Sequence, residues 1–465
     1  MTRASFRQRS TLVLVTVALV ASVTQIPTAS SSAGAARRPN VLIVVTDDQR
    51  EGFRVMPRAR HWLKAGGTYF DNAFVTTPLC CPSRASIFTG RYTHNHHVTS
   101  NDGEDGNLIQ QSTLQYYLQR AGYETALYGK YLNAWDITQP PPYFDRYALT
   151  VRSHFYSGGT WNVNGTVKTI ADYNTTYISR KARKFLHRAG AKQQPWFLYL
   201  ATAAPHGPFT PEPKYAHAPV PHWRGNPAVF EKDRSDKPNY VQRSHHRFTY
   251  GRATRKAQFR TLKSVDDLVG NVFHTLNHLG ELNDTLVIFI SDNGLMWGEH
   301  GLMGKGVPYD QSIRVPLLAR WPGHFLADAT DDRIVANVDI APTILEATGV
   351  NPDPQYPIDG RSLLGTSSHR SGLLTEHFPP GNHPPGNWDY WASTRTKTYK
   401  YTEYYEPDGT TVKFREYYDL RADPWELDNL LGDLDPSNDP NIAALSQRLA
   451  QERTCVGTTG RHACP

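Results

Sequence analysis

The sequence predicts an α/β protein: a large, mostly parallel sheet flanked by helices, with a smaller antiparallel sheet in the C-terminal part. Short apolar runs without alternation are typical of strands that are buried on both faces. Segments with helical spacing lie between these runs, as the crossovers of a parallel sheet require. Near the C-terminus, Tyr- and Thr-rich segments with partial alternation predict the smaller sheet.

Four apolar runs are the predicted strands of the large sheet: 41–45, 125–128, 196–200 and 286–290. Each is followed on its C-terminal side, directly or shortly after, by polar residues that are able to do chemistry. In open α/β sheets, ligands bind outside the carboxyl ends of the strands. We therefore expect the polar residues of all four runs to lie at one edge of the sheet.

Two segments between the strands are predicted helices. Ser112 is the predicted N-cap of a helix over 113–120, and Gly122 lies just beyond its end. Apolar residues recur at helical spacing from Phe259 to Leu276, and Gly280 closes that helix.

The C-terminal part predicts an antiparallel hairpin. Its two arms are 391–405 and 413–420, and Pro407-Asp408-Gly409 supplies the turn. A helix is predicted near 442–453, and the Pro- and Gly-rich stretch 378–388 is predicted to be a loop. We place an α/β domain at 36–370 and a small-sheet subdomain at 371–465.

The N-terminus is typical of a secretory signal peptide over 1–35. Arginines without acids precede the apolar run 11–23, and Ala33-Gly34-Ala35 fits an A-x-A cleavage site. That run is shorter than the roughly 20 residues that a spanning helix needs, and no later run is apolar enough. The sequence therefore predicts a secreted protein with no membrane span.

Composition and charge indicate which classes of protein are disfavoured. The content of 39% hydrophobic and 20% charged residues is ordinary for a globular protein and disfavours a disordered or fibrous chain. The formal net charge of +7 suits an acidic substrate such as a sulfated glycan, and it suits a solvated basic surface equally well. The chain has no arginine-rich helix, zinc-ligand spacing or aromatic RNA motif, so nucleic-acid binding is disfavoured.

The chain has four cysteines, and they fall into two pairs. Cys455 and Cys464 are expected to form a disulfide in an oxidising compartment. Cys80 and Cys81 are adjacent, and disulfide geometry disfavours a bridge between neighbours.

The segment around Cys80 carries a recognisable motif. Cys80-Cys81-Pro82-Ser83-Arg84, followed by Thr89-Gly90-Arg91, resembles the signature of the type I sulfatases. In that family a separate formylglycine-generating enzyme oxidises the first cysteine to formylglycine during export. The resemblance implies an alkaline-phosphatase-like fold, Cys80 as the precursor of the nucleophile, and Arg84 as a group that neutralises the nucleophile or the sulfate.

The resemblance also implies a metal site made of Asp47, Asp48, Asp292, Asn293 and residue 80. Oxygen ligands suit a hard cation, so Ca²⁺ is expected, with Mg²⁺ as the alternative. The other reading of these strand-end acids is that they cap helices or face solvent.

Three further residues are expected to complete the site by resemblance: Lys130, His206 and Lys305. Such residues bind the sulfate oxygens in the family, and the histidine or a lysine protonates the leaving oxygen. Many sulfatases have a second histidine where this chain has Leu132, and Asn133 is the candidate to fill that role.

Four segments carry a closer resemblance, to the N-acetylglucosamine-6-sulfatases and the heparan 6-O-endosulfatases: 80–84, 92–98, 129–133 and 262–269. The chain lacks the long basic insert of the endosulfatases. We therefore expect hydrolysis of the 6-O-sulfate of N-acetylglucosamine or a related glycosaminoglycan sugar. The alternatives are an arylsulfatase of broad specificity, a phosphate or phosphonate monoester hydrolase of the same superfamily, or a non-catalytic glycan-binding protein whose Cys80 is not converted.

Overall fold

A computed structural model of the chain describes residues 1–2, 4–5, 8–14, 38–103, 105–151, 155–192, 194–365, 369–378, 390–433 and 435–465. Arg38–Pro465 form one compact unit, to which the following description applies. Most of the predicted signal peptide over 1–35, and the predicted loop 378–388 apart from Phe378, lie outside the described residues. Among the residues described, no helix has both the length and the apolar character needed to cross a membrane.

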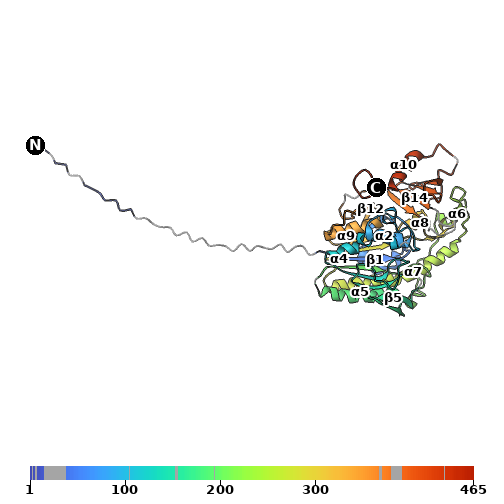
Figure 1. The fold of residues 1–465 in the computed structure, drawn as a ribbon, viewed down its shortest axis with the longest axis horizontal. Coiled ribbons are helices and arrows are strands. Elements are labelled where there is room, and N and C mark those ends of the chain that lie inside the picture. The colour runs from blue at the N-terminus through green and yellow to red at the C-terminus, as the bar shows by residue number, and fades with distance from the viewer. Residues whose placement is uncertain are drawn as a thin grey trace. The chain divides into compact units, whose positions relative to one another are not determined.

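A β-sheet forms the centre of the unit (Figure 1). It has ten strands in the order β12-β2-β11-β8-β1-β7-β3-β4-β5-β6. The strands are β1 Asn40–Thr46, β2 Thr68–Phe74, β3 Glu124–Lys130, β4 Arg146–Thr150, β5 Gly159–Val163, β6 Thr166–Ile170, β7 Trp196–Ala201, β8 Thr285–Ser291, β11 Leu317–Arg320 and β12 Ala329–Ala336. From β8 to β4 all neighbours pair in parallel. The four predicted strands are confirmed as β8, β1, β7 and β3, which lie next to one another.

Helices cover both faces of this sheet. The helices are α1 Pro57–Ala59, α2 Cys80–Thr89, α3 Thr93–His96, α4 Leu114–Arg120, α5 Asn174–Gly190, α6 Asn239–Gln242, α7 Phe248–His278, α8 Asp310–Ile313, α9 Ile340–Thr348 and α10 Ile442–Glu452. Alternate side chains of β1 enter different cores: Val41, Ile43 and Val45 pack with residues of α2, α4 and α9. Leu42 and Val44 pack with residues of α5 and α7 on the other face. The apolar run of β1 therefore reflects burial on both sides.

The predicted helix ends are correct in part. Thr113, and not Ser112, is the N-cap of α4, because Ser112 belongs to a preceding 3₁₀ turn in which its hydroxyl donates to the carbonyl of Ile109. Helix α7 begins at Phe248, well before the predicted periodic segment that starts at Phe259. Gly280 follows its end with φ +71°, as expected for a residue that closes a helix.

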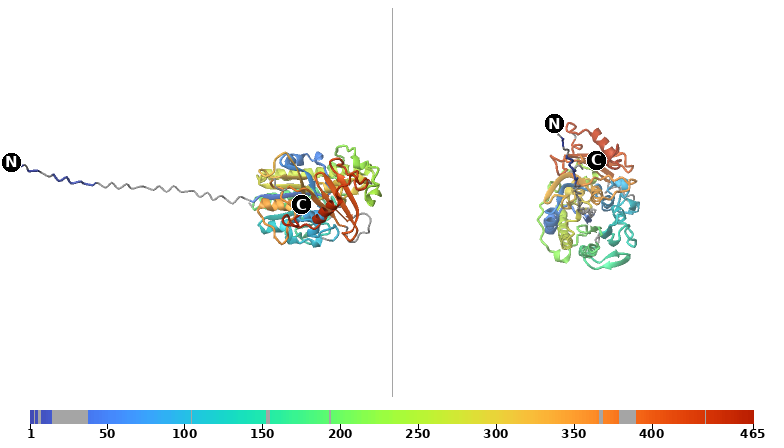
Figure 2. Two further views of the ribbon diagram at one scale, coloured as in Figure 1. Left: turned by 90° about the horizontal axis from the view of Figure 1, so that it is seen from above. Right: turned by 90° about the vertical axis from the view of Figure 1, so that its left-hand side faces the viewer.

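The C-terminal sheet has four antiparallel strands, β13 Leu373–His377, β14 Tyr390–Arg395, β15 Tyr399–Tyr405 and β16 Val412–Asp419. The predicted arm 391–405 is thus two strands, because the hydroxyl of Thr396 accepts the amide N–H groups of Thr398 and Tyr399 and forms a turn without glycine or proline. The sheet packs against residues of β2 and β12. Figure 2 shows this C-terminal part, in orange to red, at the opposite end of the unit from β5 and β6. A disulfide joins Cys455 and Cys464, as predicted. A short ribbon of β9 Met296–Trp297 and β10 Met303–Gly304 completes the strands.

Candidate active site

The polar residues that follow the central strands meet at one edge of the sheet. Asp47 and Asp48 follow β1, Asp292 and Asn293 follow β8, and Lys130 ends β3. The pairing of Thr46 with Ser291 places the two acidic ends side by side, and the amide of Asp48 donates to Oδ1 of Asp292 over 3.1 Å. The parallel arrangement that the sequence predicted therefore brings these groups together.

Lys130 enters the site because β3 lies very close to β7 at its carboxyl end. Its Nζ donates to Oδ2 of Asp47 over 2.6 Å. The preceding residue, Gly129, pairs with Ala201 and has φ +118°. A Cβ atom at this position would lie 1.8 Å from the carbonyl oxygen of Ala201, so only glycine fits here.

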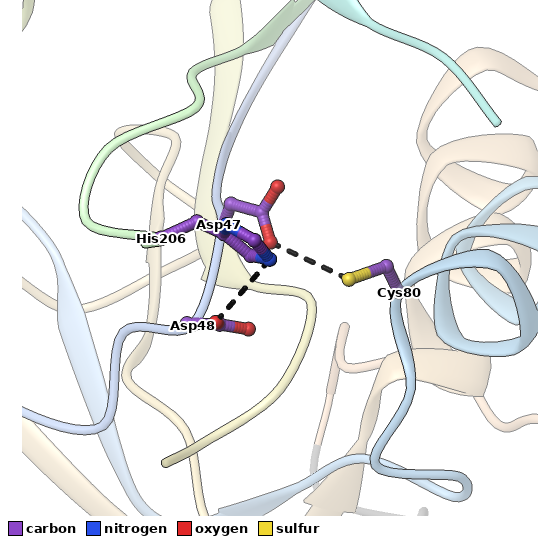
Figure 3. Close-up of side chains that lie close together, drawn as sticks. All are labelled: Asp47, Asp48, Cys80 and His206. Atoms are coloured by element: carbon purple, nitrogen blue, oxygen red, sulfur yellow. Dashed lines mark hydrogen bonds and ion pairs between the residues drawn. The ribbon is translucent and has the colours of Figure 1, made fainter. Parts of the chain in front are cut away.

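Cys80 is the first residue of α2, and its side chain points toward Asp47 (Figure 3). Its Sγ lies 3.5 Å from Oδ1 of Asp47 and 2.9 Å from Nζ of Lys305. Only 1% of Cys80 is exposed. Cys81 has a different environment: its Sγ accepts the amide N–H of Asn133 over 2.9 Å.

Arg84, one turn further along α2, is completely buried. Its Nε and Nη2 lie 3.0 and 2.9 Å from Oδ2 of Asp292, and its Nη1 donates to the carbonyl of Lys130 over 2.9 Å. One guanidinium thus joins the ends of β8 and β3 to the helix that carries Cys80.

Lys305 and His206 form the open side of the site, with 11% and 22% of their side chains exposed. Lys305 contacts both Asp48 and Cys80. In Figure 3, His206 comes from the loop after β7 and points toward Asp48, with its Nε2 3.7 Å from Oδ2 of that carboxylate. A substrate that approaches residue 80 would meet these two cationic or proton-carrying groups first.

Burial and mutual charge set the protonation of the inner groups. Burial alone would raise the pKa of Asp47, but the neighbouring cations, Lys130 foremost, hold that pKa well below its usual range. Burial would lower the pKa of Lys130, but Asp47 raises it to about 12. Burial, together with Asp47, raises the pKa of the Cys80 thiol to about 12. As an unmodified thiol, residue 80 therefore stays protonated and is a weak nucleophile.

The carboxylate and amide oxygens of the site fit a hard cation. Ligand atoms of Asp47, Asp48, Cys80 and His206 all lie within 4.8 Å of one another. The amide Nδ2 of Asn293 donates to Oδ1 of Asp48 over 2.7 Å, whereas its Oδ1 is buried without a hydrogen-bond partner. A buried amide oxygen left over beside carboxylates is a ligand that Ca²⁺ or Mg²⁺ accepts. His206, which the sequence predicted to bind sulfate oxygens or to donate a proton, also lies in this group.

Two residues that the sequence analysis missed hold the site in place. Nε2 of Gln258, on α7, donates to the carbonyls of Asp48 and Pro205 over 3.1 and 3.2 Å. The hydroxyl of Tyr156 donates to the carbonyl of His206 over 2.6 Å. Neither stands out in the sequence, because an isolated polar residue in a helix or a loop carries no motif.

Comparison with known proteins identifies the family of the chain. The family profile Sulfatase matches residues 39–350, and a profile described as N-sulphoglucosamine sulphohydrolase, C-terminal, matches residues 298–455. The chain therefore belongs to the sulfatase family, as the motif at Cys80 predicted.

Within that family the chain is similar to N-acetylglucosamine-6-sulfatase from Capra hircus, with 32% identity over 492 residues that cover 93% of this chain and 86% of the relative. It is 36% identical over 374 residues to the extracellular sulfatase SULF-1 homolog of Drosophila melanogaster, covering 75% of this chain and 33% of the relative. The chain thus spans about a third of the length of the Drosophila protein.

A solved structure confirms the fold. It is titled as a complex with its substrate D-glucosamine-2-N,6-O-disulfate, and it superposes with a TM-score of 0.77 at 21% identity. The match covers 90% of this chain and 98% of the solved one.

Proposed function

We propose that this protein hydrolyses sulfate esters, in the first place the 6-O-sulfate of N-acetylglucosamine or a related glycan sugar, after Cys80 has been converted to formylglycine. The observation that carries the proposal is the position of residue 80. Its Sγ lies 3.5 Å from Asp47 and 2.9 Å from Lys305, at the sheet edge where the acidic strand ends meet. The conversion requires a formylglycine-generating enzyme as a partner during maturation.

The converted side chain supplies a carbon with two hydroxyl groups, one to bond to sulfur and one to release the sulfate when the aldehyde reforms. The chain's own residues provide the surrounding charge. Lys130 and Arg84 remain cationic beneath the site because each is paired with a buried carboxylate. Lys305 and His206, on the open side, are placed to bind sulfate oxygens and to protonate the departing alcohol oxygen.

The metal ligands in this proposal are Asp47, Asp48, Asp292, Asn293 and residue 80. The unpartnered Oδ1 of Asn293 supports this assignment. Ca²⁺ is the first choice, because all the acidic and amide ligands are oxygen donors and extracellular calcium is abundant. The cation would neutralise sulfate charge and lower the pKa of a hydroxyl group at residue 80.

Similarity supports the choice of sugar and compartment. The N-acetylglucosamine-6-sulfatase relative matches along nearly the whole chain. The solved structure of the same fold is titled as a complex with a 6-O-sulfated glucosamine. Together with the predicted signal peptide over 1–35, the extracellular relative supports a secreted enzyme.

The test is to produce the protein with and without a formylglycine-generating enzyme and to measure sulfate release with Ca²⁺ present. Substrates are N-acetylglucosamine-6-sulfate, an aryl sulfate, and the matching aryl phosphate and phosphonate. We expect conversion to lower the intact mass by about 18 Da and to switch on release from the sugar sulfate. Cys80→Ala should be folded and inactive. Equal sulfate release by Cys80→Ala would refute the role of residue 80, and a preference for the phosphate or phosphonate ester would refute the reaction.

A further inference from the structure

A basic groove lies outside the catalytic centre, between the N-terminal half of α7 and the segment 218–223. Its cavity has a volume of about 540 Å³. Five of its lining residues carry cationic or titratable basic side chains: His222, Arg252, Arg255, Lys256 and Arg260. Among the described residues that line it, none is acidic. We call this cavity the α7 groove.

The charges of the α7 groove are arranged along one side of the helix. Arg252, Lys256 and Arg260 are spaced four residues apart and therefore lie on the same face. Like charges at this spacing destabilise a helix, and the sequence has no Asp or Glu from 237 to 265 to offset them. Arg252 and Lys256 are exposed. This unbalanced row of cations favours an external anion.

The opposite wall of the groove is held in place by the protein itself. Nε of Arg260 donates to the carbonyl of Ala218, and Nη1 of Arg255 donates to the carbonyl of Pro221, each over 3.1 Å. The half-buried ring of Trp223 packs edge-on against Trp297 with 5.6 Å between centroids. The groove is therefore formed before any ligand arrives, which lowers the entropy cost of binding.

The positive lining continues into a second cavity of about 540 Å³ that shares His222, Trp223 and Arg255. Arg50, Arg54 and Lys64 add further basic residues, and Glu51 is the one acidic residue among the described residues of its lining. Glu51 pairs with Arg255 and Glu299 pairs with Arg50, so the exposed Arg54 and Lys64 carry the remaining positive charge of this cavity. Two adjoining and mainly basic cavities suit an extended polyanion better than a single small ion.

We propose that the α7 groove is an accessory binding site for a sulfated oligosaccharide, separate from the catalytic centre. The proposal rests on the proposed function and extends it from a single sugar to a glycan chain. Arginine and lysine side chains bind sulfate groups, and the half-buried Trp223 side chain adds apolar surface to the groove beside them. Sites for single-stranded nucleic acid usually add several aromatic rings on which successive bases stack. The lining of the α7 groove has one tryptophan and a row of cations, so a sulfated glycan is the ligand that it favours.

The groove and the catalytic centre share structural elements. Gln258, on the same helix, binds the backbone of Asp48. Arg50, which lines the second cavity, follows Asp48 by two residues. The helix that lines the groove therefore also contacts the backbone of a proposed metal ligand, Asp48.

The test compares the double variant Arg252→Gln/Lys256→Gln with the control Arg183→Gln/Lys184→Gln. The control removes the same charge from two exposed positions of α5. Binding of a heparin-derived octasaccharide, its desulfated N-acetylated form and a single-stranded DNA of equal charge is measured by titration calorimetry. Sulfate release from N-acetylglucosamine-6-sulfate is measured on the same converted protein.

We expect the groove variant to bind the sulfated octasaccharide about tenfold more weakly than the control variant does. The desulfated form should bind neither protein measurably, and release from the monosaccharide should be unchanged in both. Equal octasaccharide binding by the two variants would overturn the groove assignment. DNA binding as tight as octasaccharide binding, and equally weakened in the groove variant, would overturn the glycan as its ligand. Absence of sulfate release from every variant would count against the proposed function alone, since binding is measured independently.

Discussion

Gly129→Ala should damage the catalytic centre from a position whose side chain touches no substrate. A Cβ atom there would lie 1.8 Å from the carbonyl oxygen of Ala201, whereas real Cβ atoms essentially never come within 3.0 Å of a neighbour. The ends of β3 and β7 must therefore separate by at least 1.2 Å (3.0 minus 1.8). If Lys130 follows this shift, its 2.6 Å bond to Asp47 lengthens to about 3.8 Å (2.6 plus 1.2) and is lost.

The expected cost has two parts. A non-glycine residue at φ +118° is strained by about 1–3 kcal/mol. Loss of the charged hydrogen bond between Lys130 and Asp47 adds about 1.5–3 kcal/mol. Together these parts predict that the free energy of unfolding falls by about 2.5–6 kcal/mol. We expect sulfate release to fall about a hundredfold because the lysine is displaced by about an ångström.

Gly122→Ala is the matched control. Gly122 also has positive φ, +90°, but a Cβ atom there would meet nothing within 4 Å. Gly122→Ala should lose only the stability that the backbone strain costs, about 1–3 kcal/mol, and should keep full activity. Urea unfolding and sulfate release are measured on both variants after conversion of Cys80. The difference between the variants reports the steric clash at residue 129, because both share the strain of a positive φ. Equal losses of stability with unchanged activity in both variants would refute the argument.

Three further predictions concern stability. Replacing Cys455 and Cys464 by serine should cost about 2.6 kcal/mol, from the loop-closure entropy of a nine-residue separation, and identical urea midpoints would contradict this. Burial alone would lower the pKa of His94, but its ion pair with Glu376 raises it to about 9, so the stabilisation is complete below about pH 6.5 and is lost as pH rises through 9. The wild-type free energy of unfolding should therefore fall more steeply over pH 6.5–9 than that of His94→Asn, and parallel curves would exclude the effect. Arg84→Met leaves Asp292 without its buried partner and should cost about 3–5 kcal/mol, and a wild-type urea midpoint would contradict this.

The central strands could be predicted because burial on both faces leaves a direct mark on the sequence. β1, β3, β7 and β8 are short apolar runs, and a parallel sheet forces their carboxyl ends to one edge. The turn at Thr396 could not be predicted, because its hydrogen bonds come from a threonine hydroxyl. The start of α7 was missed because its first turns carry cations on an exposed face and Gly251 against the backbone of Trp297.

In the candidate site, too, some residues could be predicted from the sequence and others could not. The motif at Cys80 and the acidic strand ends identified which residues meet. The pairing of Arg84 with Asp292, and the role of Gln258 in holding Asp48, depend on long-range packing between α2, α7 and the sheet. A single sequence contains no periodicity or motif that reports such pairs.

The burial of Cys80 restricts when the protein can mature. In the folded chain only 1% of this residue is exposed to solvent, and its sulfur lies between Asp47 on the inner side and Lys305 on the open side. A second enzyme cannot reach a side chain so enclosed, so on the proposed function the oxidation must precede folding. Protein made in cells that lack this oxidation would then be correctly folded and inactive. Later addition of the oxidising enzyme to the folded protein would not restore its activity.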